Sequence, residues 1–140
     1  MHSWRALPKY QLTHMFTRIL TALVILGSTA MAQHTTDTLD QVKAGLSEKK
    51  AVLIDVREQD EWNAGHLKAA SLVPLSELKV GIAEAELAKK IPKDKVVYCH
   101  CRSGGRVIPA SEILKKLGYD VRPLKSGYQD LVNSGFEKAP

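Results

Sequence analysis

The sequence predicts an α/β fold in which a small parallel β-sheet is flanked by helices on both faces. First, residues 51–56 (AVLIDV) form a run of mainly apolar residues, which is typical of a strand that is covered on both faces. Second, a similar run over residues 96–99 leads through a glycine-rich turn into a helical pattern. Third, strand and helix patterns alternate along the chain. Since ligands of such folds bind at the carboxyl ends of the strands, we expect the functional site there.

The N-terminal part of the chain has the features of an export signal. Residues 19–27 are uncharged and apolar, a basic residue precedes them, and an A-x-A site ends at Ala32. The run is shorter than the roughly 20 residues that span a bilayer, so we expect no stable membrane anchor. We therefore predict a signal peptide over residues 1–32 and a periplasmic or secreted domain over residues 33–140. Met15 opens a more compact basic region and is the expected true start.

Composition indicates one globular domain. The chain has 140 residues, of which 44% are hydrophobic and 25% are charged. The formal net charge is +5, but the leader carries three basic residues and no acidic one, which leaves 17 basic and 15 acidic residues after it. This small excess gives little support for a nucleic-acid partner, and we expect none.

A short polar segment, residues 33–37, follows the leader and has no periodicity. We therefore expect it to be loosely held and its His34 to be solvated. The next segment has apolar residues at helical spacing, namely Leu39, Val42 and Leu46. It predicts a first helix with Thr36 or Asp37 as the N-cap.

Short strands and helices alternate in the middle of the chain. A helical turn over residues 58–63, ended by a glycine, follows the strand over residues 51–56. A second strand is predicted over residues 71–74, where the proline indicates an end or an edge. One helical pattern then runs from Ser76 to Ile91, although Gly81 weakens its first half.

The C-terminal part begins with the strand over residues 96–99. The helix after it has apolar residues at helical spacing, namely Ala110, Ile113, Leu114 and Leu117. Pro109 lies in the first turn, where proline is tolerated, and Gly118 lies where a C-terminal cap is expected. A strand over residues 120–124 and a helix over residues 127–132 complete the predicted fold.

The turn between the third strand and the next helix carries the candidate chemistry. A helix N-terminus presents unpaired N–H groups and the positive end of its dipole, which favour the thiolate form of a cysteine placed there. Cys101 has this position, and two arginines add positive charge. Small residues let several loop N–H groups turn toward one centre. We therefore predict that Cys101 is a nucleophile inside an anion-binding loop formed by Arg102, Ser103, Gly104, Gly105 and Arg106.

Three separated motifs resemble those of the rhodanese-like sulfurtransferases: residues 53–58 (LIDVRE), 65–70 (GHLKAA) and 101–106 (CRSGGR). The resemblance covers nearly all of residues 33–140 and implies a rhodanese-like fold. It also implies that Cys101 takes a sulfane sulfur from a donor such as thiosulfate, becomes a persulfide, and passes the sulfur to cyanide or a thiol. The implied partners are thus a small anionic sulfur donor and a thiophilic acceptor, without a cofactor.

The same resemblance implies roles for other residues. Arg102 and Arg106 would hold the anionic donor and stabilise the persulfide. Structural roles are implied for Asp55, Arg57, Glu61 and His66, which would tie the loops around the first strand.

Other function classes share parts of this pattern. Cysteine phosphatases and arsenate reductases also have a His-Cys-x-x-Gly start, but five residues separate their cysteine from the arginine, whereas four separate Cys101 from Arg106. The smaller ring suits sulfur better than a tetrahedral phosphate or arsenate. A persulfide carrier, a redox protein or a docking module could use the same fold, but the intact loop argues against an inactive docking module.

Cys99 raises a separate question. A structural disulfide to Cys101 would close a very small, strained loop, and no second His or Cys cluster completes a zinc site, so no metal is expected. As the last strand residue, Cys99 is expected to be a small buried apolar side chain. The functional alternative is a resolving thiol that attacks a Cys101 persulfide or forms a transient disulfide.

Overall fold

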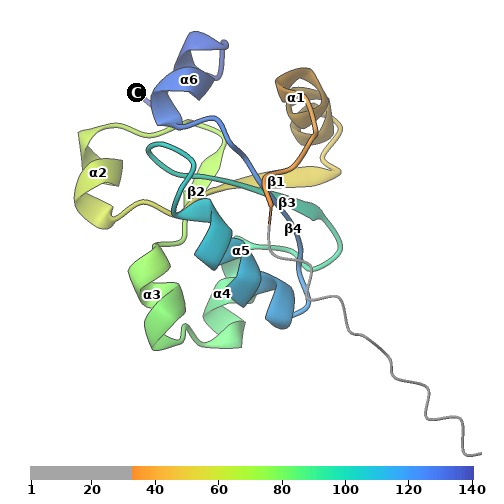
Figure 1. Cartoon of the computed structure of the whole chain (residues 1–140), viewed down its shortest axis with the longest axis vertical. Helices are drawn as coiled ribbons and strands as arrows, with labels where there is room; N and C mark the ends of the chain where they lie inside the picture. Colours follow the sequence, from red (N-terminus) through yellow and green to blue (C-terminus); the bar gives the residue numbers. More distant parts are fainter. Residues whose placement is uncertain (1–32) are drawn as a thin grey trace, which may run out of the picture.

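The computed structural model describes residues 33–140, and the predicted leader with Met15 lies outside the described residues. Strands and helices follow one another in the predicted order, except that two helices replace the one predicted before the third strand (Figure 1). The elements are α1 (Leu39–Ser47), β1 (Ala51–Asp55), α2 (Gln59–Ala64), β2 (Ala70–Leu72), α3 (Leu75–Val80), α4 (Glu84–Lys90), β3 (Val96–His100), α5 (Val107–Lys116), β4 (Asp120–Pro123) and α6 (Tyr128–Asn133).

The four strands form one parallel sheet in the order β2-β1-β3-β4. Asp55 at the end of β1 pairs in register with Leu72 of β2 and with His100 of β3. The carboxyl ends of the two central strands therefore lie side by side, and Cys101 follows directly at this edge. The prediction of a small parallel sheet is confirmed.

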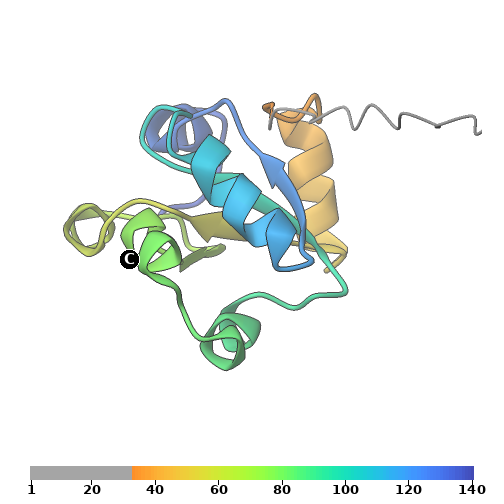
Figure 2. The ribbon, with the colours of Figure 1, turned by 60° about the horizontal axis from the view of Figure 1, so that its bottom comes forward.

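Helices cover both faces of the sheet (Figures 1 and 2). Because side chains alternate along a strand, β1 and β3 supply residues to two separate cores. Ile54, Val97 and Cys99 pack with residues of α3, α4 and α5, whereas Leu53 and Tyr98 pack with residues of α1 and α6. This two-sided burial confirms the predicted α/β class and accounts for the apolar character of the central strands.

The single helix predicted from Ser76 to Ile91 is wrong, because two helices occupy this stretch. Helix α3 ends at Val80, Gly81 caps it with φ +103°, and α4 begins only at Glu84. This φ lies in the left-handed region that favours glycine and that ends a right-handed helix. Apolar residues continue at helical spacing across the break, so the periodicity alone does not reveal it.

The prediction that residues 33–37 are loosely held is also wrong. The Thr35 N–H donates to the carbonyl of Pro123 at 2.7 Å. The Asp37 carboxylate accepts hydrogen bonds from Arg122 at 2.8 Å and from the Tyr98 hydroxyl at 2.7 Å. We call residues 33–37 the N-terminal strap, since they are tied to β4 and β3 at several points.

Smaller differences concern element ends. The N-cap of α1 is Thr38, whose hydroxyl accepts the Gln41 N–H, rather than Thr36 or Asp37. Asp37 is not the cap, because its carboxylate is hydrogen-bonded to Arg122 and Tyr98 instead. Strand β3 extends one residue further than predicted, to His100, and β4 ends at Pro123 rather than at residue 124.

Candidate active site

The loop Cys101–Arg106 connects the carboxyl end of β3 to the N-terminus of α5. Cys101 is buried, with 1% of its surface exposed, and both cysteines are free thiols. The Gly104 N–H donates to Cys101 Sγ at 3.1 Å. Among the described residues this is the one backbone N–H bonded to the sulfur, so the anion-binding loop has one donor in place in this conformation.

Two glycines let the loop pack closely against the segment before α6. Gly104 has φ +83°, and a β-carbon on it would overlap the backbone carbonyl of Lys125. A β-carbon on Gly127 would overlap the carbonyl of Arg102. The Tyr128 N–H, the first of α6, donates to the Cys101 carbonyl at 2.8 Å. The start of α6 therefore forms a second wall of the site.

Arg106 is bound to Glu61 of α2. Its two terminal nitrogens donate to the two carboxylate oxygens at 2.6 and 2.8 Å. This guanidinium lowers the pKa of Glu61 to about 2 from the ordinary 4.5. The ion pair ties the end of the loop to α2, and the binding of a substrate anion by Arg106 stays a prediction.

Arg102 is an exposed residue of the loop. It borders a hollow of about 400 Å³ together with Arg57, Glu61, Ala64, Tyr128 and Gln129. Ser103 and Gly105 are also exposed, whereas Gly104 is buried. Arg102 thus brings positive charge to an open hollow at the cysteine loop, whereas the Arg57 guanidinium is paired with the buried Asp55.

A buried ion pair connects the elements that surround the site. Asp55 is fully buried, and its two carboxylate oxygens accept hydrogen bonds from the Arg57 guanidinium, from Nε at 3.0 and 2.9 Å and from Nη2 at 2.7 Å. Arg57 also donates to the Gly65 carbonyl at 2.8 Å and lies 4.2 Å from the centre of the Tyr128 ring. The pair therefore joins β1, the end of α2 and the start of α6.

Two histidines lie next to residues that this ion pair contacts. His100 is fully buried, with Nε2 at 3.6 Å from Asp55 Oδ2 and Nδ1 at 3.3 Å from the Cys101 carbonyl. Burial lowers its pKa, although Asp55 opposes this, so the imidazole is neutral at pH 7. His66 stacks on Trp62 with ring centres 3.7 Å apart, and its Nδ1 lies 3.1 Å from the Trp62 carbonyl.

Cys99 is fully buried on the face of the sheet covered by α5. Its thiol lies 3.9 Å from the Val107 carbonyl. Burial raises the pKa of Cys99 well above that of an exposed thiol, which keeps it protonated. This environment is that of a buried apolar side chain rather than of a reactive thiol.

The prediction that His34 is solvated is wrong, because this residue is half-buried and contacts the loop. Its Nε2 lies 2.6 Å from the carbonyl oxygen of Gly104 in the centre of the loop. No local pattern marks this residue, because its partner lies 70 positions further along the chain. His34 of the N-terminal strap is thus part of the site.

Residues 38–134 match the family model described as the rhodanese-like domain. The chain belongs to the rhodanese-like domain family. This match spans the sheet, the cysteine loop and α6, and therefore includes every site residue described above except His34.

Known proteins similar to this rhodanese-like chain cover most of the described residues. It is 32% identical over 108 residues to YqhL of Bacillus subtilis, which covers 76% of this chain and 81% of YqhL. It is 30% identical over 97 residues to the human thiosulfate:glutathione sulfurtransferase, covering 64% and 84%. Among solved structures, the human single-domain sulfurtransferase TSTD1 has a TM-score of 0.62 and 25% identity, covering 72% and 97%. Sulfurtransferases are therefore among its relatives.

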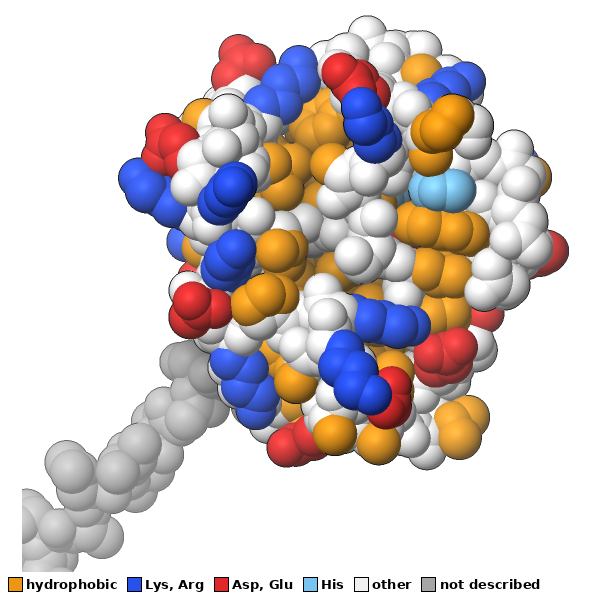
Figure 3. Space-filling model, turned by 180° about the vertical axis from the view of Figure 1, so that it is seen from behind, with side chains coloured by type: hydrophobic (Ala, Val, Ile, Leu, Met, Phe, Trp, Pro, Cys, Tyr) orange, Lys and Arg blue, Asp and Glu red, His pale blue; other side chains and the backbone are white. Residues whose placement is uncertain are grey.

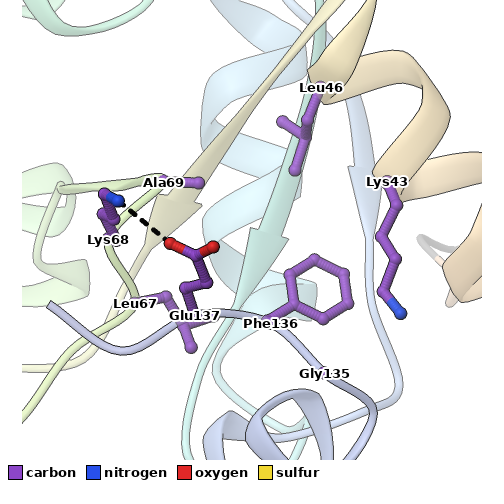
Figure 4. Close-up of a pocket in the computed structure, with 8 residues that line it drawn as sticks. All are labelled: Lys43, Leu46, Leu67, Lys68, Ala69, Gly135, Phe136 and Glu137. Carbon is purple, nitrogen blue, oxygen red and sulfur yellow. Dashed lines mark hydrogen bonds and ion pairs between the residues drawn. The ribbon is translucent and has the colours of Figure 1, made fainter.

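A second hollow of the rhodanese-like domain lies away from the loop. It measures about 440 Å³ and is bordered by an ion pair between Lys68 and Glu137 at 3.0 Å (Figure 4). Its remaining lining residues are Lys43, Leu46, Leu67, Ala69, Gly135 and Phe136. On the face opposite to that of Figure 1, apolar surface is bordered by basic side chains (Figure 3). Because this hollow contains no nucleophile and shares no residue with the loop, we assign no chemistry to it.

Residues 33–140 hold no cluster of three or more His, Cys, Asp or Glu side chains that could bind a metal ion. No helix among the same residues combines the length and the apolar character that crossing a membrane requires.

Proposed function

We propose that this rhodanese-like protein is an exported sulfurtransferase that moves a sulfane sulfur from thiosulfate to cyanide or a thiol through a persulfide on Cys101. One observation carries the proposal: a buried cysteine at the end of a central parallel strand has a backbone N–H directed at its sulfur. A fixed donor of this kind stabilises negative charge on that atom.

The proposed reaction has two steps. The Cys101 thiolate attacks the outer sulfur of thiosulfate, the S–S bond of thiosulfate breaks, and sulfite leaves with the bonding electrons. Cyanide or a thiolate then attacks the terminal sulfur of the persulfide, which gives thiocyanate or a new persulfide and returns the Cys101 thiolate. No net oxidation occurs, so the cycle needs no cofactor.

The described side chains have separate tasks in this cycle. The Gly104 N–H stabilises the anionic sulfur, and Arg102 attracts the anionic donor to the hollow at the loop. Support for the donor and for a thiol acceptor comes from the human relative, which is named as a thiosulfate:glutathione sulfurtransferase.

The test is the intact mass of the purified protein before thiosulfate, after thiosulfate, and then after cyanide. We expect a gain of one sulfur atom with thiosulfate and its loss with cyanide. Cys101→Ser should show no gain, whereas the matched control Cys99→Ala should behave as the wild type, because Cys99 is buried and protonated. An unchanged mass would refute the proposal, and a loss of two hydrogens from a Cys99–Cys101 disulfide would indicate a redox protein instead.

A further inference from the structure

We propose that His34 is a positioning residue of the cysteine loop. Its imidazole holds the Gly104 carbonyl, and this keeps the N–H of the same residue directed at the Cys101 sulfur. The inference rests on the proposed role of Cys101 as the residue that accepts the sulfur. It extends the active site to one residue of the N-terminal strap, His34.

The contact defines the state of the imidazole. Nε2 of His34 lies 2.6 Å from the Gly104 carbonyl oxygen. A carbonyl only accepts hydrogen bonds, so Nε2 carries a proton and donates it. Both polar groups of Gly104 are then engaged, the carbonyl by His34 and the N–H by the Cys101 sulfur at 3.1 Å.

Gly104 needs such a restraint. It has no β-carbon and adopts φ +83°, a region that glycine leaves easily because its backbone has many accessible conformations. If the peptide groups around Gly104 rotate, its N–H turns away from the sulfur. A hydrogen bond to its carbonyl opposes this rotation directly.

His34 itself is held firmly enough to act as a restraint. The neighbouring Thr35 N–H donates to Pro123 at 2.7 Å, and Asp37 is bound by Arg122 at 2.8 Å. Pro123 is the last residue of β4 and pairs in register with Cys99 of β3. The strap is therefore fastened to the same edge of the sheet from which the loop leaves.

Other contacts hold other parts of the loop. The Tyr128 N–H binds the Cys101 carbonyl at one end, and Glu61 binds the Arg106 side chain at the other. Within residues 33–140, His34 is the side chain that hydrogen-bonds to the Gly104 carbonyl. Loss of His34 should therefore loosen the centre of the loop while both its ends stay attached.

Four variants of the protein test this role. His34→Ala removes the donor, His34→Gln places an amide N–H at about the reach of Nε2, and His34→Asn has the same amide on a shorter chain. Thr36→Ala is the matched control, since Thr36 is an exposed residue of the same strap. The two readouts are the pH dependence of Cys101 alkylation by iodoacetamide, located by tandem mass spectrometry, and kcat and KM for sulfur transfer from thiosulfate to cyanide.

For His34→Ala and His34→Asn we expect half-maximal alkylation of Cys101 at a higher pH than in the wild type. We also expect kcat to fall about tenfold, less than on removal of a whole oxyanion donor, with KM for thiosulfate nearly unchanged. His34→Gln should restore most of both readouts, and Thr36→Ala should match the wild type. If His34→Ala does not fold, the comparison of His34→Gln with His34→Asn tests the proposed role of His34.

Two outcomes would overturn the proposal. In one, His34→Ala and His34→Asn match the wild type in both readouts, so the hydrogen bond has no effect on Cys101. In the other, His34→Gln is as impaired as His34→Ala, so the loss has another cause. If the wild type transfers no sulfur but the alkylation profile still shifts as expected, the proposed function fails and the positioning role of His34 stands.

Discussion

At the scale of single residues, the Glu61–Arg106 ion pair makes stability depend on pH. The pKa of Glu61 is about 2 in the folded protein and near 4.5 when the chain is unfolded. The unfolded chain therefore binds this proton first as the pH falls. The stabilisation is complete above about pH 4.5 and is lost between there and pH 2.

We expect Glu61→Gln to lose about 1 kcal/mol of unfolding free energy at pH 7, because the pair is partly exposed to solvent. The difference from the wild type should disappear near pH 2. Denaturant unfolding between pH 2 and pH 7 measures it, with Glu86→Gln, from the exposed Lys89 pair, as the control. An offset between wild type and Glu61→Gln that does not change with pH would contradict this account.

The residues of the loop could be predicted from the sequence, but not all of the residues that they contact. Cys101 could be predicted because it follows an apolar strand pattern directly and because two glycines and two arginines lie within the next five residues. The contact between His34 and Gly104 cannot be predicted in this way, since it depends on where β4 places the strap. The pairing of Arg106 with Glu61 is likewise a product of the folded arrangement of α2 and the loop.

At the scale of elements, strand and helix types could be predicted because apolar periodicity reports burial on one or both faces. Continuous apolar runs correctly predicted β1 and β3 as strands that are covered on both faces. The break between α3 and α4 could not be predicted, because Leu78, Ile82 and Leu87 continue a helical spacing across it. Residues 81–83 separate the two helices, and the positive φ of Gly81 begins this break.

The contact between α6 and the cysteine loop is another feature at this scale, and Gly127→Ala tests it. The new methyl group would overlap the Arg102 carbonyl, so α6 or the loop must move. We expect a loss of about 1–3 kcal/mol of stability and a large loss of sulfur transfer. Thermal unfolding and activity are the measurements.

Asn133→Ala, at the exposed far end of the same helix, is the control for Gly127→Ala and should change neither property much. If Gly127→Ala has the stability and activity of the wild type, the loop accommodates the methyl group without loss of stability. The start of α6 would then not be part of the site.

At the scale of the whole molecule, export stays a prediction, and the junction after Ala32 gives its test. We expect the protein recovered from the periplasm or the medium to begin at Gln33, since an A-x-A site precedes it. N-terminal sequencing of fractionated cells measures this, and Ala30→Arg should block the cleavage. A full-length chain confined to the cytoplasm would contradict the prediction.

The contacts of the N-terminal strap also affect the order in which parts of the chain fold. Its contacts with Tyr98, Gly104 and Arg122 span 61, 70 and 85 positions. Contacts between such distant residues form late, because closing a long loop costs entropy before the contact is gained. The first residues of the domain therefore complete the cysteine loop only when the last strand is in the sheet. An incomplete chain, however well formed its helices, would carry the thiol without the geometry that makes it useful.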